Sequence, residues 1–169
     1  MQNMAIQHVF ADQAANSNGQ PSEYTFQMEF VVIICRLLAV AYPRLFYRVI
    51  SEAKERDECG NRRQHLDILL RDGSSLPRYG FELVVEATHS VFDEHCRRAD
   101  YYRKLHDCSM LVVNLCAQNI LSGYFGPTLP GVTPVHVIYD VQKGLAELVF
   151  RDSRKSVSIE GSAWQVMFS

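Results

Sequence analysis

Two acidic residues stand inside apolar segments of this 169-residue chain. Asp67 lies in the run HLDILL, and Glu82 lies in the run YGFELVVE. A carboxylate in such surroundings is unfavourable unless it is paired, hydrogen-bonded or bound to a cation. Carboxylate oxygens are the ligands that Mg²⁺ and Mn²⁺ prefer. We therefore expect Asp67 and Glu82 to hold Mg²⁺ (or Mn²⁺), which would activate water and stabilise charge on a phosphate.

Three further residues could complete such a site. Glu29 could reach the metal from a neighbouring helix, although it could equally be the partner of Arg36. Lys104 and His95, which follow Glu82 in the chain, could supply a base or a phosphate clamp. The alternative for this later segment is a surface helix whose charges form i,i+3 and i,i+4 ion pairs.

Most of the basic side chains that could bind nucleic acid lie in one segment. Arg97, Arg98 and Arg103, together with Tyr101, could hold phosphates and stack on bases. The formal net charge of -2 argues against a protein that coats nucleic acid by bulk electrostatics. Contact with DNA would therefore depend on this local patch, unless the segment is a generic surface helix.

The first half of the chain is typical of a helix followed by a meander of strands. Helical spacing of apolar residues predicts a helix over 22–42, with Ser22 as its N-cap and Pro43 at its end. Runs rich in aromatic and β-branched residues predict three antiparallel strands: residues 44–53, 65–73 and 79–88. Asp67 and Glu82 would then lie on neighbouring strands.

After the meander, the spacing of the apolar residues changes from that of a strand to that of a helix. Ser90 as N-cap and Asp93 three residues later predict a helix over 90–106. Its apolar stripe is expected to be Phe92, Cys96, Ala99 and Tyr102. The apolar run 109–117 predicts a buried central strand that is reached by a βαβ crossover. A Gly- and Pro-rich loop and a hairpin at 134–151 follow, and the tail beyond is ambiguous.

The composition is that of an ordinary globular protein, with 47% hydrophobic and 21% charged residues. Small polar residues predict a flexible arm at 1–21, followed by a single domain at 22–169. The five cysteines lack CxxC spacing, which favours free thiols and an intracellular location. The apolar run 30–42 is too short to span a bilayer, so it is expected to be a buried helix with no membrane contact.

Several segments resemble a known family. They are PSEYTFQMEFVVIICRLL, HLDILLRDG, YGFELVVEATHSVFDEHCRRADYYRK, MLVVNL and VHVIYD. In their order and spacing they are similar to the restriction-endonuclease-like domain of crinkler-type effector and toxin proteins, within the wider PD-(D/E)XK superfamily. The similarity covers about residues 21–150.

This resemblance implies an α/β fold with a restriction-endonuclease-like core, in which helices flank a central mixed β-sheet. It also implies metal-dependent hydrolysis of DNA and residence in the nucleus of a host cell. Position by position, Asp67 matches the strand aspartate, Glu82 the glutamate of the (D/E)XK element, and Glu29 the acid of the first helix. The lysine expected two residues after the glutamate is missing, because Val84 stands there.

Three interpretations follow. The first is a divergent metal-dependent DNA endonuclease that uses Asp67 and Glu82. The second is an inactive nuclease-fold module that binds DNA or a host nuclear protein. The third is an oligomeric module that forms a homodimer through the apolar hairpin 134–151, since exposed strand edges can pair between subunits.

Overall fold

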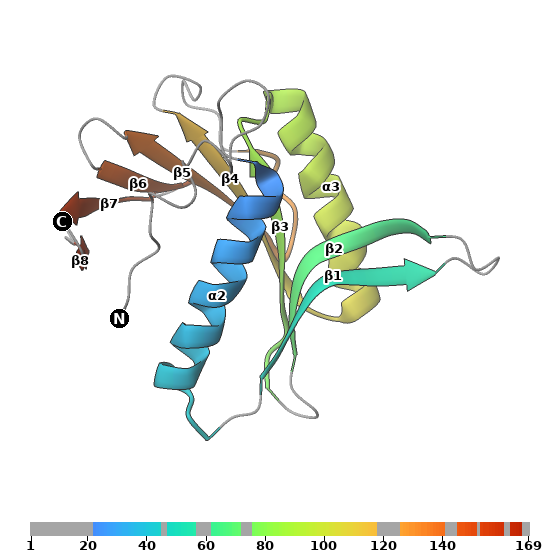
Figure 1. Ribbon diagram of the computed structural model, residues 1–169. Helices are drawn as coiled ribbons and strands as arrows, with labels where there is room; N and C mark the ends of the chain where they lie inside the picture. The colour runs from blue at the N-terminus through green and yellow to red at the C-terminus, as the bar shows by residue number, and fades with distance from the viewer. Residues whose placement is uncertain are drawn as a thin grey trace.

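The computed structural model describes residues 22–44, 47–56, 62–71, 76–117, 126–140, 145–151, 153–160 and 163–166. They form a twisted β-sheet with a helix on each face (Figure 1). The α/β class and the central mixed sheet flanked by helices are confirmed. The arm expected at residues 1–21 lies outside the described residues.

The strands follow one another across the sheet in chain order. The helices are α2 (Glu23–Ala41) and α3 (His89–His106). The strands are β1 (Arg48–Arg56), β2 (Arg62–Arg71), β3 (Tyr79–Val85), β4 (Ser109–Ala117), β5 (Val132–Asp140), β6 (Leu145–Phe150), β7 (Ser153–Glu160) and β8 (Ala163–Val166).

The type of strand pairing changes twice across the sheet, from antiparallel to parallel and back to antiparallel. β1, β2 and β3 form an antiparallel meander. β3, β4 and β5 are parallel, and α3 is the crossover that returns the chain from the end of β3 to the start of β4. β5 and β6 are antiparallel neighbours, as are the strands after them. The predicted meander, crossover and late hairpin are therefore confirmed.

The two faces of the sheet bury separate apolar clusters. Leu83 and Val84, adjacent on β3, point to opposite faces, as the alternation of a strand requires. The face under α3 is covered by the predicted stripe of Phe92, Cys96, Ala99 and Tyr102. The other face is covered by α2, through Phe26 and Ile34.

Several predicted boundaries were wrong. β2 begins at Arg62 rather than at residue 65, and β3 ends at Val85 rather than at residue 88. β1 begins at Arg48, four residues later than expected, because Pro43 and the residue after it form a turn. The N-cap of α3 is Thr88 rather than Ser90, and the Thr88 hydroxyl accepts a hydrogen bond from Val91 N at 3.4 Å. Ser90 lies within the first turn of the helix instead.

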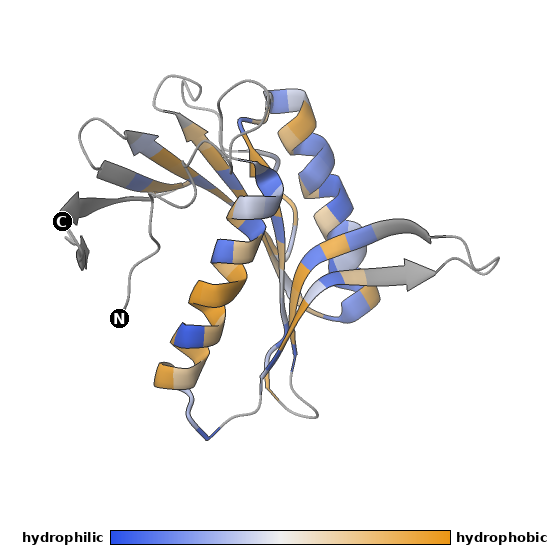
Figure 2. Cartoon of the chain, in the orientation of Figure 1, coloured by the Kyte–Doolittle hydropathy of each residue, from blue (hydrophilic) through white to orange (hydrophobic). Residues whose placement is uncertain are grey.

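Helix α2 is not the buried helix that was predicted. Ser22 caps it as expected, but along its length Phe26, Gln27 and Ile34 are the buried residues. In Figure 2 the apolar colour extends over the C-terminal half of α2. The 19 residues of α2 are long and apolar enough to cross a membrane. The prediction that this segment is too short to span a bilayer considered residues 30–42 alone and was therefore wrong.

Candidate functional site

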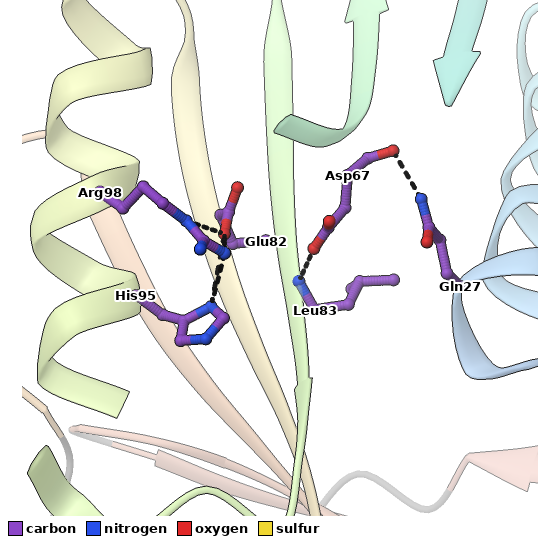
Figure 3. A network of polar contacts seen from close by, with 6 residues as sticks. All are labelled: Gln27, Asp67, Glu82, Leu83, His95 and Arg98. Atoms are coloured by element: carbon purple, nitrogen blue, oxygen red, sulfur yellow. Dashed lines mark hydrogen bonds and ion pairs between the residues drawn. The ribbon is translucent and has the colours of Figure 1, made fainter. Parts of the chain in front are cut away.

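Glu82 is the centre of a polar network between β3 and α3 (Figure 3). Its side chain is 0% exposed. Arg98 on α3 donates from Nε to Glu82 Oε2 at 2.9 Å, and it also donates from Nη2 to the same oxygen. His95 Nδ1 lies 3.4 Å from that oxygen and 3.0 Å from Arg98 Nη2. The facing helix thus supplies the cation that a buried carboxylate needs.

The spacing of α3 explains why His95 and Arg98 meet at Glu82. Residues three apart lie on the same side of a helix, and this side borders the buried stripe of α3. Arg97 is exposed. Arg98 has 30% of its side chain exposed, so it reaches Glu82 from the helix surface. One of two consecutive arginines therefore enters the site, whereas the other faces solvent.

Asp67 links β2 to β3 where their regular pairing ends. That pairing joins residues 68–70 to residues 79–81. Beyond it, Leu83 N donates to Asp67 Oδ2 at 2.7 Å, so the carboxylate acts as the acceptor. On the other side, Gln27 Nε2 of α2 donates to the backbone oxygen of Asp67 at 3.0 Å. Asp67, which is 5% exposed, therefore ties together β2, β3 and α2.

The backbone around Asp67 is irregular. Leu66 and Leu69 both belong to the cluster under α3, whereas Ile68 belongs to the cluster under α2, so the alternation of β2 breaks near Asp67. Opposite Asp67 on β1, Glu52 has a φ of 49°. Such a conformation is unfavourable for residues other than glycine and is enriched at functional sites.

The two acids influence one another through space. Burial and the charge of Glu82 raise the pKa of Asp67 from 3.8 to about 7. The Leu83 N–H and Arg98 act in the opposite direction but do not cancel this effect. Figure 3 shows the carboxyl groups directed at different partners, Glu82 at α3 and Asp67 at the backbone of β3. Near neutral pH, Asp67 is therefore only partly ionised.

Two buried oxygens in this region have no hydrogen-bond partner among the described residues. They are Glu82 Oε1 and the hydroxyl of Tyr102, which lies one turn after Arg98 on α3. Burial, followed by the charge of Glu82, raises the pKa of Tyr102 to about 12. A buried polar atom without a partner costs about 1–3 kcal/mol. The site can therefore gain free energy by binding a water molecule or a cation.

The oxygen donors suit a hard divalent cation. Glu82 Oε1 is buried and without a partner among the described residues, and Asp67 is electrostatically coupled to Glu82. Glu82 would hold the ion through this oxygen, and Asp67 would join it only if its carboxyl group turned from Leu83 N towards Glu82. Across the described ranges, no group of three or more His, Cys, Asp or Glu side chains is placed to hold a metal, so Glu29, half-buried on α2, does not join them. Binding of Mg²⁺ or Mn²⁺ stays a prediction.

Lys104, expected as a catalytic base, is engaged elsewhere. Its Nζ lies 2.6 Å from Asp100 Oδ2, and its side chain is 64% exposed. Arg103 Nε donates to Asp100 Oδ1 at 3.1 Å. Both contacts are i,i+3 and i,i+4 ion pairs, as expected if this segment is a surface helix. Tyr101 is also exposed, and its ring packs edge-on against Tyr102 with centroids 5.6 Å apart.

Sequence reasoning missed a second buried polar pair beneath α3. Asn114 Oδ1 accepts a hydrogen bond from Ala87 N at 3.3 Å, and Asn114 Nδ2 lies 3.4 Å from His136 Nδ1. Burial lowers the pKa of His136 to about 4, and Phe92 packs on its ring with centroids 4.6 Å apart. One signal was available, because Asn114 interrupts the apolar run MLVVNLCA.

Comparisons with known proteins add nothing to these observations. What the chain does must be inferred from Asp67, Glu82 and the side chains around them. No protein-family model matches the chain, and no curated protein and no solved structure is significantly similar to it.

Proposed function

We propose that the chain is a divergent, metal-dependent DNA endonuclease with a restriction-endonuclease-like fold. The contact of Arg98 and His95 with Glu82 carries this proposal. The lysine position of the resembled family is taken by Val84, which is buried in the cluster under α3. Helix α3 supplies positive charge beside the acid instead, and what matters for binding a phosphate is where that charge lies.

The order of elements also supports the proposal. A helix, an antiparallel meander, a second helix and a parallel strand follow one another, with acids on the second and third strands. This is the order of elements that the resemblance implies for the core of the family. The expected action on DNA and residence in a host nucleus come from that same resemblance.

Each residue of the site has a distinct part in this proposal. Asp67 and Glu82 would hold Mg²⁺ or Mn²⁺, which when bound would supply a Lewis acid and an activated water. Arg98 would bind the phosphate. His95 lies beside both Glu82 and Arg98, where a proton acceptor would be useful. Lys104 is replaced in this scheme, since its ammonium group is paired with Asp100.

Nicking of supercoiled plasmid in Mg²⁺ or Mn²⁺ tests the proposal. We expect the parent to nick, and Glu82→Gln and Asp67→Asn to lose roughly a hundredfold or more of this activity. Glu94→Gln is the matched control, because Glu94 is an exposed acid on α3. Equal cleavage by the parent and Glu82→Gln, or cleavage by neither, would contradict the proposal.

The hydrogen bonds that Glu82 already accepts from Arg98 favour a second candidate function. Because Oε2 already accepts from Arg98, the pair can act as a structural ion pair in a module that binds DNA or a host nuclear protein without cutting. The exposed Arg97 and Tyr101 would then form the contact surface. This function predicts salt-dependent DNA binding that persists in Glu82→Gln and without divalent ions. Binding that requires both acids and a divalent ion would count against it.

A further inference from the structure

Three exposed arginines form a row across the first three strands, at the end of the sheet where β1 starts, β2 ends and β3 starts (Figure 1). Arg48 on β1 is the register partner of Arg71 on β2. The register of β2 and β3 pairs Leu70 with Tyr79, and extending it by one residue sets Arg71 opposite Arg78. We call Arg48, Arg71 and Arg78 the arginine row.

The arginine row is unfavourable for the folded protein by itself. Like charges directly opposite one another on neighbouring strands destabilise a sheet. Among the described residues, no acid forms an ion pair with any of the three arginines. Arg78 donates instead from Nη1 to the backbone oxygen of His106, at the end of α3, at 3.2 Å. A partner with several negative charges would offset the repulsion within the row.

The arginine row lies on the same face of the sheet as Glu82. Val49, Leu70 and Tyr79 belong to the apolar cluster under α2 or pack against it. Successive residues of a strand point to opposite faces, so the arginines that adjoin these three residues point to the face of α3. Arg78 and Glu82 are four residues apart along the chain, which is about 13 Å in a strand. α3 packs on β3, β4 and β5, so the start of β1 and the end of β2 lie beside it.

We propose that the arginine row binds the sugar-phosphate backbone of DNA on its way to Glu82. One DNA strand carries a negative charge for about every 3.4 Å of helix axis. Neighbouring β-strands are about 4.8 Å apart, so the row extends over about 10 Å and would meet about three phosphates. The choice of DNA rests on the proposed function, but binding by the row requires neither the metal nor cleavage.

The row supplies charges that the predicted patch on α3 lacks. In that patch Arg98 is engaged by Glu82, and Arg103 is engaged by Asp100. Arg97 is exposed, but a single arginine gives little electrostatic affinity for a polyanion. Because its arginines are carried by paired strands, the row also presents them at fixed spacing, which favours binding.

The surroundings of the row favour nucleic acid over a membrane. Binding to an anionic bilayer usually combines basic residues with apolar side chains that enter the lipid. The large apolar side chains that are exposed in the described part of the chain lie on α2, directly after it, or on α3. None of them lies on a strand beside the row. A hydrophilic polyanion therefore fits this surface better than a bilayer.

Fluorescence anisotropy of a short labelled DNA duplex in EDTA tests the inference, because EDTA prevents metal-dependent cleavage. We expect Arg48→Gln/Arg71→Gln to bind roughly tenfold or more weakly than the parent, and to reduce the slope of log affinity against log salt by about 2. Arg36→Gln/Arg44→Gln is the matched control, since it removes the same charge from two exposed arginines of α2 and the turn after it. It should bind nearly as tightly as the parent.

Thermal melting without DNA separates a binding role from a structural one. Arg71→Gln should keep or raise the melting temperature of the parent, because it removes the charge that faces both Arg48 and Arg78. An arginine that only supported the fold would lose melting temperature together with DNA affinity. A lower melting temperature in Arg71→Gln would therefore contradict the inference.

Three binding results would overturn it. One is a parent that does not bind the duplex. Another is equal binding by the row variant and the control, which would place the contact elsewhere, for example at Arg97 and Tyr101 on α3. The third is flotation with phosphatidylserine vesicles that the row variant alone loses while its DNA affinity is unchanged, which would assign the row to a membrane.

Plasmid nicking in Mg²⁺ distinguishes this inference from the proposed function. A parent that binds DNA through the row but does not nick would overturn the nuclease and leave the row in place. A parent that nicks, and whose row variant binds and nicks equally well, would overturn the row and leave the nuclease in place.

Discussion

Arg98 on α3 donates two hydrogen bonds to a single oxygen of Glu82 on β3, and the other oxygen of that carboxylate has no partner among the described residues. The arginine therefore compensates the charge of Glu82 but leaves one buried acceptor open. Arg98 stabilises the fold in the absence of ligand. Any cation that reaches Glu82 must share the carboxylate with it.

Removal of Arg98 should destabilise the protein strongly. We expect Arg98→Gln to lower the free energy of unfolding by about 2–4 kcal/mol, less than for a fully buried pair because Arg98 reaches solvent. Urea denaturation measures the change. Arg97→Gln is the control, since Arg97 is exposed on the same helix, and it should change stability by about 0.5 kcal/mol or less. Equal losses in the two variants would mean that the pair with Glu82 does not form.

Asp67 should make the protein less stable as pH rises. Its pKa is raised from 3.8 to about 7 by burial and by Glu82, so the folded state holds a proton that the unfolded chain releases above about pH 4. The free energy of unfolding therefore falls between about pH 4 and pH 7, by up to about 1.4 kcal/mol per pH unit. Asp67→Asn removes this contribution.

Thermal melting of the two proteins from pH 5 to pH 8 measures the effect. We expect the stability of Asp67→Asn relative to the parent to increase with pH up to about pH 7 and to level off above it. Asp100→Asn serves as the control, because the hydrogen bond from Lys104 lowers the pKa of Asp100 rather than raising it. A pH-independent difference between the parent and Asp67→Asn would show that Asp67 is ionised throughout this range.

The elements that follow from local pattern could be predicted from the sequence. β4 spans Ser109–Ala117, the range predicted from its apolar run, because a strand buried on both faces is apolar throughout. The stripe on α3 was also correct, since helical spacing alone determines which residues share a face. The burial of Asp67 and Glu82 followed from their apolar neighbours in the chain.

The predictions that were wrong or incomplete concern contacts between segments that are distant in the sequence. Helical spacing puts Arg98 rather than Arg97 beside the buried stripe, but its contact with Glu82 also depends on how α3 packs against β3, which the sequence does not reveal. Lys104 was chosen for its chemistry, although Asp100 one turn before it is a nearer partner. α2 was expected to be buried because it is apolar, but apolar composition does not reveal whether a second surface covers it.

His136 should make the protein less stable at acidic pH. Burial lowers its pKa from 6.5 to about 4, so the folded state keeps a neutral ring while the unfolded chain takes up a proton below about pH 6.5. Stability is therefore lost as pH falls from about 6.5 to 4. We expect the melting temperature of His136→Gln to improve relative to the parent over this range. His65→Gln, at an exposed position on β2, should show no such trend.

Lys104 should be dispensable if Arg98 and His95 serve the site. We expect Lys104→Ala to keep the plasmid nicking and the melting temperature of the parent, because its ammonium group lies at the surface beside Asp100. His95→Gln should reduce nicking while the protein remains folded. Loss of nicking in a folded Lys104→Ala variant would return Lys104 to the site and remove the role given to His95.

The hydroxyl of Tyr102 should contribute little to stability in the absence of a ligand. It is buried and has no hydrogen-bond partner among the described residues, so Tyr102→Phe loses no such bond and is expected to be neutral or to stabilise by up to about 1 kcal/mol. Tyr139→Phe is the matched control, because the Tyr139 hydroxyl donates to Glu86 Oε1 at 3.0 Å. Loss of the Tyr139 hydroxyl should lower the free energy of unfolding by about 1–2 kcal/mol. A comparable loss in Tyr102→Phe, measured in urea, would show that the Tyr102 hydroxyl already has a hydrogen-bond partner, such as a bound water.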